Sequence, residues 1–346
     1  MSETNHKLYF SDSRNMQEIQ DESVDLVVTS PPYCMVQIWD HVFSQLNPAI
    51  EIALEKEDGN LAFELMHQEL DKVWNEVYRV LKNNGIVCIN IGDATRSIGS
   101  DFKLYSSHAR IISHCCKIGF QCLPLIIWSK LTNSPNKFMG SGMLPPGGYV
   151  TLEHEYIIIL RKGGKREFKA DKEKQRRIGS SYFWEERNIW FSDIWDLKGV
   201  HQSLKNNNTR ERSAAFPFEL AYRLISMHSL KHDTVLDPFL GTGTTMLAAM
   251  SLERNSIGVE IAPNFLELID SRIKDIVTYA NEYNQNRLEE HKEYMKAYTA
   301  KHGESKYRNE FYDFPVKTKQ EISFKIRELI DIKKNDEHTY LVSYNE

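Results

Sequence analysis

The sequence lacks the features that mark membrane, secreted and metal-binding proteins. No apolar run approaches the roughly 20 residues that a membrane-spanning helix needs, and residues 1–7 lack the apolar core of a signal peptide. Cysteine is scarce, and the five cysteines are odd in number, unevenly spaced and mostly inside apolar segments. They are Cys34, Cys88, Cys115, Cys116 and Cys122. We interpret them as reduced core residues of a cytoplasmic protein, and their spacing indicates no metal site.

An excess of positive charge is also absent. The formal net charge is −5 at pH 7, so contact with nucleic acid would require a local basic patch. No Gly-Lys-Ser or Gly-Lys-Thr phosphate loop occurs, which argues against an NTPase. What is present is a globular composition of 346 residues, 41% hydrophobic and 26% charged. That length suits one large domain with additions, or two domains.

Short apolar runs rich in Val, Ile and Leu alternate with helical patterns up to about residue 275. Such runs predict strands that are buried on both faces, and they cover residues 7–10, 24–28, 86–91, 123–128, 156–160, 234–236 and 257–259. Between them, apolar residues such as Leu70, Trp74 and Val77 share one helical face. The alternation predicts an α/β fold with a doubly wound, mostly parallel sheet, and residues 119–130 and 151–162 can form an antiparallel edge pair.

Three segments interrupt this alternation. Residues 34–60 contain turn signals and are interpreted as an inserted loop or a small helical excursion. Residues 161–212 are polar and basic. Residues 279–346 are highly charged and almost free of glycine, so we predict a helical C-terminal appendage to a domain of residues 1–278.

A glycine-containing run follows the predicted strand at 234–236 and precedes a predicted helix. It reads Asp237-Pro238-Phe239-Leu240-Gly241-Thr242-Gly243-Thr244-Thr245. Gly241 and Gly243 would let the backbone turn tightly and approach a ligand, and Glu260 ends the next strand, where an acidic residue commonly binds ribose hydroxyls. A plain glycine turn or a dehydrogenase loop would also explain Gly-Thr-Gly alone. The full run, with Ile257-Gly258-Val259-Glu260 after it, is far more specific for a nucleotide-like cofactor.

A second motif directly follows the predicted strand at 24–28 and reads Thr29-Ser30-Pro31-Pro32-Tyr33. Sheets of α/β proteins bind ligands at the carboxyl ends of their strands. Two prolines remove two backbone donors and leave rigid carbonyl acceptors, while Ser30 adds a hydroxyl acceptor and Tyr33 a flat face. This set suits an aromatic amine, with acceptors for its N–H groups and a ring for stacking. A Pro-Pro-Tyr that stands alone is more often a loop with a packing tyrosine.

In this order, the two motifs resemble those of the β class of S-adenosylmethionine-dependent DNA amino-methyltransferases, whose catalytic motif precedes the cofactor motif. The similarity covers residues 7 to about 275. Further matching segments are Val73-Trp74-Asn75-Glu76-Val77-Tyr78-Arg79-Val80-Leu81-Lys82, Gly85, Ile89-Asn90-Ile91-Gly92-Asp93, Trp128-Ser129-Lys130, His154-Glu155-Tyr156 and Phe216-Pro217-Phe218-Glu219-Leu220. The resemblance implies a Rossmann-like methyltransferase fold that binds S-adenosylmethionine.

The resemblance also implies a set of cofactor-binding residues at strand ends and in the glycine-containing run. They are Asp12, Asp93, Phe216, Pro217, Asp237, Pro238, Phe239, Gly241, Thr242, Gly243, Thr244 and Glu260. Within this set, Phe239 is expected beside the cofactor and Asp12 at its adenine. Two alternatives stay open, because Asp12 also fits a turn and Asp93 also fits a helix cap.

The implied reaction is methylation of an exocyclic amino group on a base flipped out of DNA, with Ser30, Pro31, Pro32 and Tyr33 as catalytic residues. The Ser30 hydroxyl and the Pro31 carbonyl would accept the amine hydrogens and localise the nitrogen lone pair for direct in-line transfer, while Tyr33 would stack on the base. In this family, Ser-Pro-Pro-Tyr is associated with N4-cytosine and Asp-Pro-Pro-Tyr with N6-adenine enzymes. Cytosine N4 is therefore the leading prediction and adenine N6 the alternative. The sequence has no Pro-Cys dipeptide, which C5-cytosine enzymes use for their nucleophile.

The family places its target-recognition region between the His-Glu-Tyr and Phe-Pro segments, here residues 165–212. Its basic start could neutralise phosphates, and Ser181-Tyr182-Phe183-Trp184 could meet bases, although a charge run is usually a solvated face. A second DNA-facing loop is expected near residues 133–140, with a plain hairpin connection as its alternative. The predicted DNA contacts are Lys137, Lys165, Arg166, Lys174, Arg176 and Arg177.

The predicted partner is double-stranded DNA, with a cognate restriction endonuclease and a homodimer as further candidates and no membrane. A nucleotide-dependent oxidoreductase would leave residues 29–33 unexplained. A non-catalytic DNA-binding module would not need intact Ser30, Tyr33 and Asp237. His154 could act as a base, but direct transfer needs none before methylation, so we expect a structural role for it.

Overall fold

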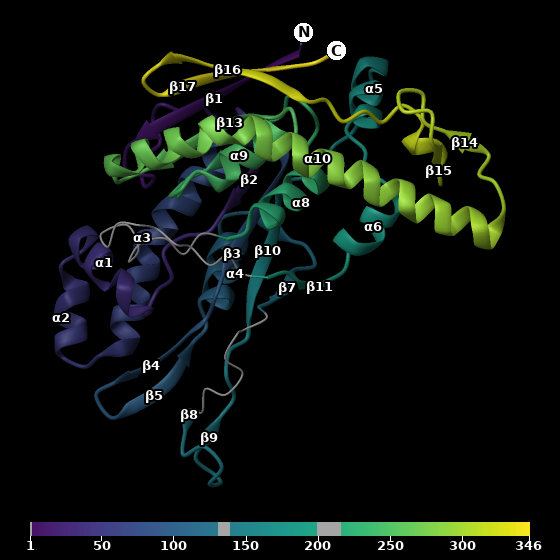
Figure 1. The fold of residues 1–346 in the computed structure, drawn as a ribbon. Helices are drawn as coiled ribbons and strands as arrows, with labels where there is room; N and C mark the ends of the chain where they lie inside the picture. The colour runs from purple at the N-terminus through teal and green to yellow at the C-terminus, as the bar shows by residue number, and fades with distance from the viewer. Residues whose placement is uncertain (1, 131–138, 199–215) are drawn as a thin grey trace.

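The structure is a computed structural model that describes residues 2–130, 139–198 and 216–346. Within these residues, one mixed sheet of eleven strands runs through the molecule (Figure 1). Its strands are β1 (Ser2–Phe10), β2 (Val24–Thr29), β3 (Leu81–Ile91), β6 (Phe120–Cys122), β7 (Ile126–Ser129), β10 (His154–Lys162), β11 (Ile194–Asp196), β12 (Thr234–Asp237), β13 (Asn255–Glu260), β16 (Leu329–Asp336) and β17 (Thr339–Tyr344). They lie in the order β11-β7-β10-β3-β2-β12-β13-β1-β17-β16, and β6 pairs with β10.

The centre of the sheet is parallel, as predicted. Strands β3, β2, β12, β13 and β1 pair in parallel one after another. All seven strands predicted from apolar runs lie in this sheet. The expected antiparallel pair is also confirmed, because β10 runs antiparallel to both β6 and β7. The carboxyl ends of β2, β12, β13 and β1 therefore meet at one edge.

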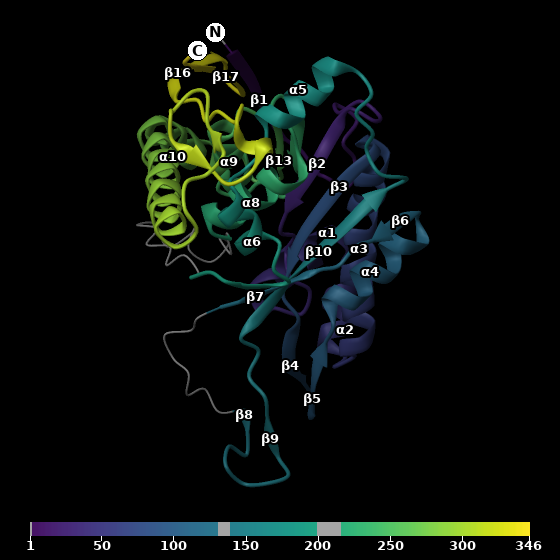
Figure 2. The ribbon, with the colours of Figure 1, turned by 90° about the vertical axis from the view of Figure 1, so that its right-hand side faces the viewer.

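Helices cover both faces of the sheet (Figure 2). One face carries α1 (Asp40–Leu46), α2 (Ala49–Glu55), α3 (Gly59–Val80) and α4 (Ser107–Lys117); the other carries α8 (Phe218–His228), α9 (Thr244–Ser251) and α10 (Leu266–His302). In β2, Leu26 and Val28 pack into one core and Val27 into the other, which is why this strand is apolar throughout. No helix among the described residues has the length and apolar character needed to cross a membrane.

Residues 34–60, left open as loop or helix, form mainly the short helices α1 and α2. The α3 helix follows them, begins where the Asp58 carboxylate accepts a hydrogen bond from Leu61 N, and buries Leu70, Trp74 and Val77 against the sheet. These helices bring an apolar surface to the edge where β2 ends.

The C-terminal region is helical only in its first part. The α10 helix spans 37 residues and runs through position 278, so the predicted domain boundary falls inside one continuous helix. Beyond it, β16 and β17 form a hairpin that extends the main sheet, with Ser2 of β1 paired to Tyr344 of β17. The end of the chain is thus part of the same sheet as its beginning (Figure 1).

Two hairpins project beyond the edge where β2 and β3 end (Figure 1). One consists of β4 (Ala94–Ile98) and β5 (Asp101–Tyr105), and the other of β8 (Met139–Gly140) and β9 (Gly148–Tyr149). The rings of Phe102 and Tyr149 lie 4.8 Å apart, so the two hairpins contact each other.

Candidate active site

The two sequence motifs meet at the carboxyl ends of neighbouring parallel strands. Thr29, at the end of β2, donates a hydrogen bond of 2.6 Å from Oγ1 to Oδ1 of Asp237, at the end of β12. Thr245 Oγ1 donates to the other carboxylate oxygen at 2.7 Å, and the amide N of Phe239 donates to Oδ1 at 3.0 Å. A single carboxylate therefore joins segments that lie 208 residues apart in sequence.

The hydrogen bonds that hold the Asp237 carboxylate come from neutral donors. Burial raises its pKa to about 6, although the bonds from Thr29, Thr245 and Phe239 act in the opposite direction. A nearby positive charge would lower this pKa again, because it favours the ionised form. The position is therefore suited to a cationic ligand.

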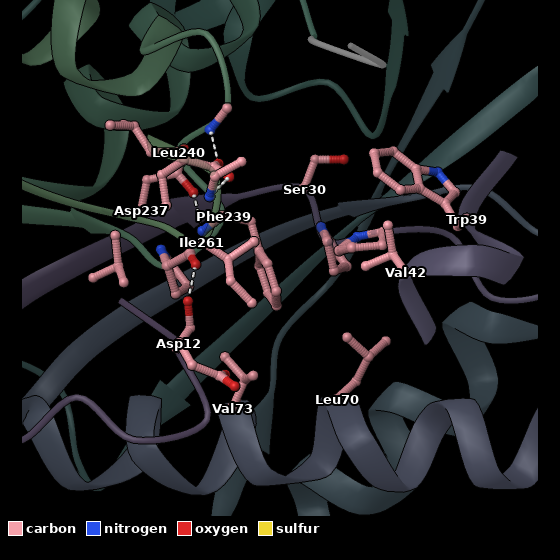
Figure 3. Close-up of a pocket in the computed structure, with 18 of the residues that line it drawn as sticks. Asp12, Ser30, Trp39, Val42, Leu70, Val73, Asp237, Phe239, Leu240 and Ile261 are labelled. Atoms are coloured by element: carbon pink, nitrogen blue, oxygen red, sulfur yellow. Dashed lines mark hydrogen bonds between the residues drawn. The ribbon is translucent and has the colours of Figure 1, made fainter. Parts of the chain in front are cut away.

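A cavity of about 160 Å³ opens beside this contact, between the strand ends and α3 (Figure 3). Leu70 and Val73 point into it from α3, and Ser30 and Phe239 face them from the sheet edge. Of the residues predicted for the catalytic and cofactor sites, those that line the cavity are Asp12, Ser30, Pro31, Pro32, Phe216, Asp237, Pro238, Phe239, Gly241, Thr242, Thr244 and Glu260. The structure thus gathers both motifs around one space.

Glu260 and the glycine-containing loop hold each other in place. The Glu260 carboxylate accepts hydrogen bonds from Gly241 N at 2.8 Å and from Ala262 N at 2.9 Å. Gly241 and Gly243 have φ values of +52° and +81°, a region in which side chains are strained. Gly243 does not line the cavity; it forms the N-cap of α9 and lets the chain enter that helix.

Asp12 lies at the cavity and also forms the turn that the sequence left open. Its carboxylate accepts from Arg14 N at 2.9 Å and pairs with the Arg14 guanidinium at 2.7 Å. Burial acts to raise the pKa of Asp12, but the hydrogen bonds and charge of Arg14 outweigh it and hold the pKa below its ordinary value. Asp12 is therefore available as a negatively charged acceptor at neutral pH.

One wall of the cavity was not predicted from the sequence. Trp39, the last residue of the short 3-10 helix η1 (Gln37–Trp39), lines it together with Val42, Phe43 and Leu46 of α1. In the close-up the Ser30 side chain points toward Trp39 (Figure 3). The apolar spacing of residues 39–46 is the only sequence signal for this wall, and it carries no recognisable motif.

Tyr33 is half-buried and is not among the residues that line the cavity. Its hydroxyl contacts Ser30 Oγ at 3.2 Å, Asn90 Nδ2 at 2.9 Å and Glu155 Oε2 at 2.8 Å. Its ring packs against Gly92, where an added Cβ would approach Tyr33 Cε2 to 2.9 Å. Burial and the Glu155 charge raise the pKa of Tyr33 well above its ordinary value, so the phenol stays protonated.

Asp93 and Pro217 also lie outside the cavity lining. The Asp93 carboxylate accepts from His108 N at 3.1 Å and from His108 Nδ1 at 2.7 Å, in the first turn of α4. It therefore serves as the helix cap that the sequence allowed. Pro217 is the N-cap of α8 and follows Phe216, which does reach the cavity.

The predicted basic segment lies at the opposite edge of the sheet. Arg166 and Arg176 pair at 2.6 and 2.7 Å with Asp233, which precedes β12 and is only 2% exposed. The Arg177 guanidinium lies 4.6 Å from the Phe168 ring centroid, and Lys174 pairs with Asp171. The structure thus separates Lys165, Arg166, Lys174, Arg176 and Arg177 from the cavity by the length of β12. Lys137 and residues 199–212 of the predicted recognition region lie outside the described residues.

Comparison with known proteins agrees with this geometry. The family model described as DNA methylase, which covers N6 and N4 methyltransferases, matches residues 24–271. The chain belongs to this DNA methylase family. Its matched region begins at β2 and includes all the residues that line the cavity except Asp12, Ser13 and Arg14.

Several relatives are similar over most of their length. Type II methyltransferase M.MthZI of Methanothermobacter thermautotrophicus is 56% identical over 320 residues, which cover 92% of this chain and 89% of the relative. Type II methyltransferase M.MjaI of Methanocaldococcus jannaschii is 50% identical over 281 residues, which cover 78% of this chain and 91% of the relative. A solved structure from Thermus thermophilus, named as a putative DNA modification methylase and complexed with S-adenosyl-L-methionine, has a TM-score of 0.60 and 32% identity, and covers 78% of this chain and 94% of that one.

S-adenosylmethionine is accordingly the cofactor of this DNA methylase. The donor set of the cavity fits a molecule with positive sulfonium and ammonium groups, since four carboxylates among the described residues line it against one guanidinium, that of Arg14. The carboxylates belong to Asp12, Glu69, Asp237 and Glu260. Phe239 and Ile261 add the apolar surface that a purine ring needs.

Proposed function

We propose that this protein is a sequence-specific DNA methyltransferase that methylates the N4 amino group of cytosine in double-stranded DNA. The observation that carries the proposal is the position of Ser30, which lines the same cavity as Glu260 and Phe239 and is linked through Thr29 to Asp237. A base amine beside Ser30 would then lie next to the cofactor cavity. Because a paired base cannot reach the bottom of such a cavity, the target base would be flipped out of the duplex.

Ser30 and Pro31 would accept hydrogen bonds from the two amine hydrogens. The amine lone pair is delocalised into the ring, and two acceptors on its hydrogens would favour a tetrahedral nitrogen with a localised pair. Bound S-adenosylmethionine supplies an electrophilic methyl group on a positively charged sulfur, which leaves as a neutral thioether. A carbon–nitrogen bond forms as the carbon–sulfur bond breaks, and the nitrogen then loses one proton to solvent. The contribution of the protein is positioning.

Trp39 would provide the flat surface for the base. It shares the cavity with Ser30, whereas the Tyr33 ring packs against Gly92. We therefore transfer the stacking role that the sequence suggested for Tyr33 to Trp39. Asp12, Phe239 and Glu260 would hold the cofactor on the other side.

Ser30 supports cytosine over adenine as the target, through its resemblance to the Ser-Pro-Pro-Tyr variant. The test is to incubate duplex DNA with the protein and S-adenosylmethionine, digest it to nucleosides and identify the modified base by mass spectrometry. N4-methylcytosine is expected. N6-methyladenine would reject the cytosine assignment, and unmodified DNA would reject the reaction. The Ser30→Ala variant is the matched control, because it should bind cofactor but slow methyl transfer.

The curated relatives are named type II methyltransferases, so we propose that this enzyme protects DNA in a restriction-modification system with a cognate endonuclease. The duplex would approach the sheet edge beyond which the two hairpins project (Figure 1), where β2 ends and Ser30 follows. A homodimer is a further proposal, which sedimentation of the free protein would test. Resistance of methylated DNA to cleavage by the partner endonuclease would test the biological role.

A further inference from the structure

A buried carboxylate lies directly behind the catalytic loop. Glu155, at the start of β10, is 7% exposed. Its Oε2 accepts hydrogen bonds from the Tyr33 hydroxyl at 2.8 Å and from Asn90 Nδ2 at 2.7 Å, and its Oε1 accepts from Lys130 Nζ. Neither Glu155 nor Asn90 lines the cavity, so this cluster does not belong to the cofactor site.

The charge of Glu155 fixes the direction of the hydrogen bonds around it. An ionised carboxylate can only accept, so the Tyr33 hydroxyl must donate its single proton to Glu155. The Tyr33 oxygen then accepts from Asn90 Nδ2 at 2.9 Å and from Ser30 Oγ at 3.2 Å. Asn90 has the two amide hydrogens that this arrangement requires, one for Tyr33 and one for Glu155.

The same chain fixes the state of Ser30. A serine hydroxyl has one proton and two lone pairs, and here the proton is committed to Tyr33. Only lone pairs are left for a group in the cavity. We infer that Glu155 is a positioning residue that acts through Tyr33 to make Ser30 a hydrogen-bond acceptor for the amine of the flipped base. This role rests on the proposed function, because it presupposes that an amine binds at Ser30.

This arrangement also explains why the segment His154-Glu155-Tyr156 matters without a catalytic histidine. The His154 ring packs edge-on against Tyr156, with centroids 4.9 Å apart. The neighbouring carboxylate is the group that reaches the catalytic loop. We expected a structural role for His154 and made no prediction for Glu155, because spacing alone does not distinguish a buried Glu from an exposed Glu at a strand end.

The Glu155→Gln variant should reverse the chain while keeping the shape of the side chain. Lys130 can only donate, so it would hold the carboxamide oxygen and turn the NH₂ group toward Tyr33. Tyr33 could then no longer donate to residue 155 and would donate to Ser30 instead. The Ser30 proton would point into the cavity, where it opposes the amine hydrogens.

The experiment measures single-turnover methyl transfer to duplex DNA at saturating DNA and cofactor. We expect Glu155→Gln and Tyr33→Phe each to slow transfer roughly tenfold to hundredfold. The double variant should be no slower than the slower single variant, because both changes break the same chain. Cofactor affinity by calorimetry should stay at the wild-type value in both variants. Glu153→Gln, an exposed residue two positions earlier, is the matched control and should transfer at the wild-type rate.

Three outcomes would overturn the positioning role. Multiplicative losses in the double variant would show that Glu155 and Tyr33 act independently. A wild-type rate in Tyr33→Phe would do so even if Glu155→Gln fails to fold, because the phenylalanine keeps the ring. Loss of cofactor affinity in Glu155→Gln would assign Glu155 to the cofactor site instead. If wild-type protein methylates no DNA, the proposed function itself fails, which is a separate result.

Discussion

Strand β12 carries a buried aspartate at each end, and the two have opposite surroundings. Asp233, before the strand, is paired with the guanidinium groups of Arg166 and Arg176. Asp237, at its end, is equally buried at 2% exposure but is held by two hydroxyls and one amide N. One carboxylate is neutralised within the protein. The other is held by neutral donors, which fits the role proposed for it at the cofactor cavity.

The contrast between the two ends also bears on the basic run that was predicted to contact DNA. From residue 161 to 177 the sequence is basic, which predicted a DNA surface. Two of its arginines, Arg166 and Arg176, form ion pairs with Asp233, which lies 67 and 57 residues further along the chain, respectively. A run of charges gives the composition of a surface but not its partners, whereas a motif that follows a strand also gives a location.

The largest effect on the free energy of unfolding is expected at the amino end of β12. Asp233→Ala should destabilise the protein by about 3–5 kcal/mol, because it leaves two partly buried guanidinium groups without their carboxylate. Urea unfolding monitored by circular dichroism would measure it. The control is Asp171→Ala, which removes an exposed pair with Lys174 and should cost less than about 1 kcal/mol. Equal, small losses in both variants would remove the contrast between the two ends of β12.

At the carboxyl end the effect should depend on pH. Because the pKa of Asp237 is raised from 3.8 to about 6 in the folded protein, the folded state binds more protons than the unfolded state between these values. Its contribution is therefore fully present below about pH 4 and is lost as pH rises through 6. The unfolding free energy of wild type minus that of Asp237→Asn should fall by about 2 kcal/mol from pH 4 to pH 7. A difference that stays constant with pH would contradict the raised pKa.

Glu260→Ala should weaken S-adenosylmethionine binding by roughly 1.5–3 kcal/mol, the value of a charge-assisted hydrogen bond. Titration calorimetry on the folded variant measures this. Glu267→Ala, an exposed residue in the first turn of α10, is the control and should bind normally. Unchanged affinity in Glu260→Ala would reject its role in holding the cofactor and leave it as a loop anchor for Gly241.

Trp39→Ala should weaken capture of the flipped base by about 1–3 kcal/mol, the usual cost of a lost base–aromatic stack. DNA with a mismatch at the target base should recover part of that loss, since the base costs less to extrude. Phe311→Ala, which removes an exposed ring outside the cavity lining, is the control. A wild-type rate of methyl transfer in Trp39→Ala would show that another residue stacks on the base.

The smallest effect is expected for Arg177→Ala. Its guanidinium packs on Phe168 at the edge away from Ser30, so the slope of log DNA affinity against log salt should not change. A slope reduced by about one would mean that Arg177 releases a counterion on binding. In that case the duplex would reach both ends of β12, and the amino end would carry a second DNA surface.

The sequence predicted those parts of the fold and site that depend on neighbours along the chain. Apolar runs such as 24–28 predict buried strands, and a motif directly after such a run predicts a position at the sheet edge. The hairpin of β16 and β17 was not predicted, because Leu329–Asp336 is mostly exposed and lacks an apolar run. The proposed roles of Trp39 and Glu155 were not predicted for a different reason. They depend on the positions of Ser30 and Tyr33 in the folded protein, which no local sequence pattern encodes.

The pairing of Ser2 with Tyr344 brings these two residues side by side in the sheet, so the order of the segments along the chain could be permuted. Antiparallel partners lie about 5 Å apart, so a short linker could join the two ends without crossing the sheet, and the chain could open at a surface loop instead. The bond between Thr29 and Asp237 would form in such a permuted chain as it does here, since it depends on adjacent strands and not on which motif comes first. The order of the catalytic and cofactor segments is thus a property of where the polypeptide begins, while the chemistry belongs to the sheet.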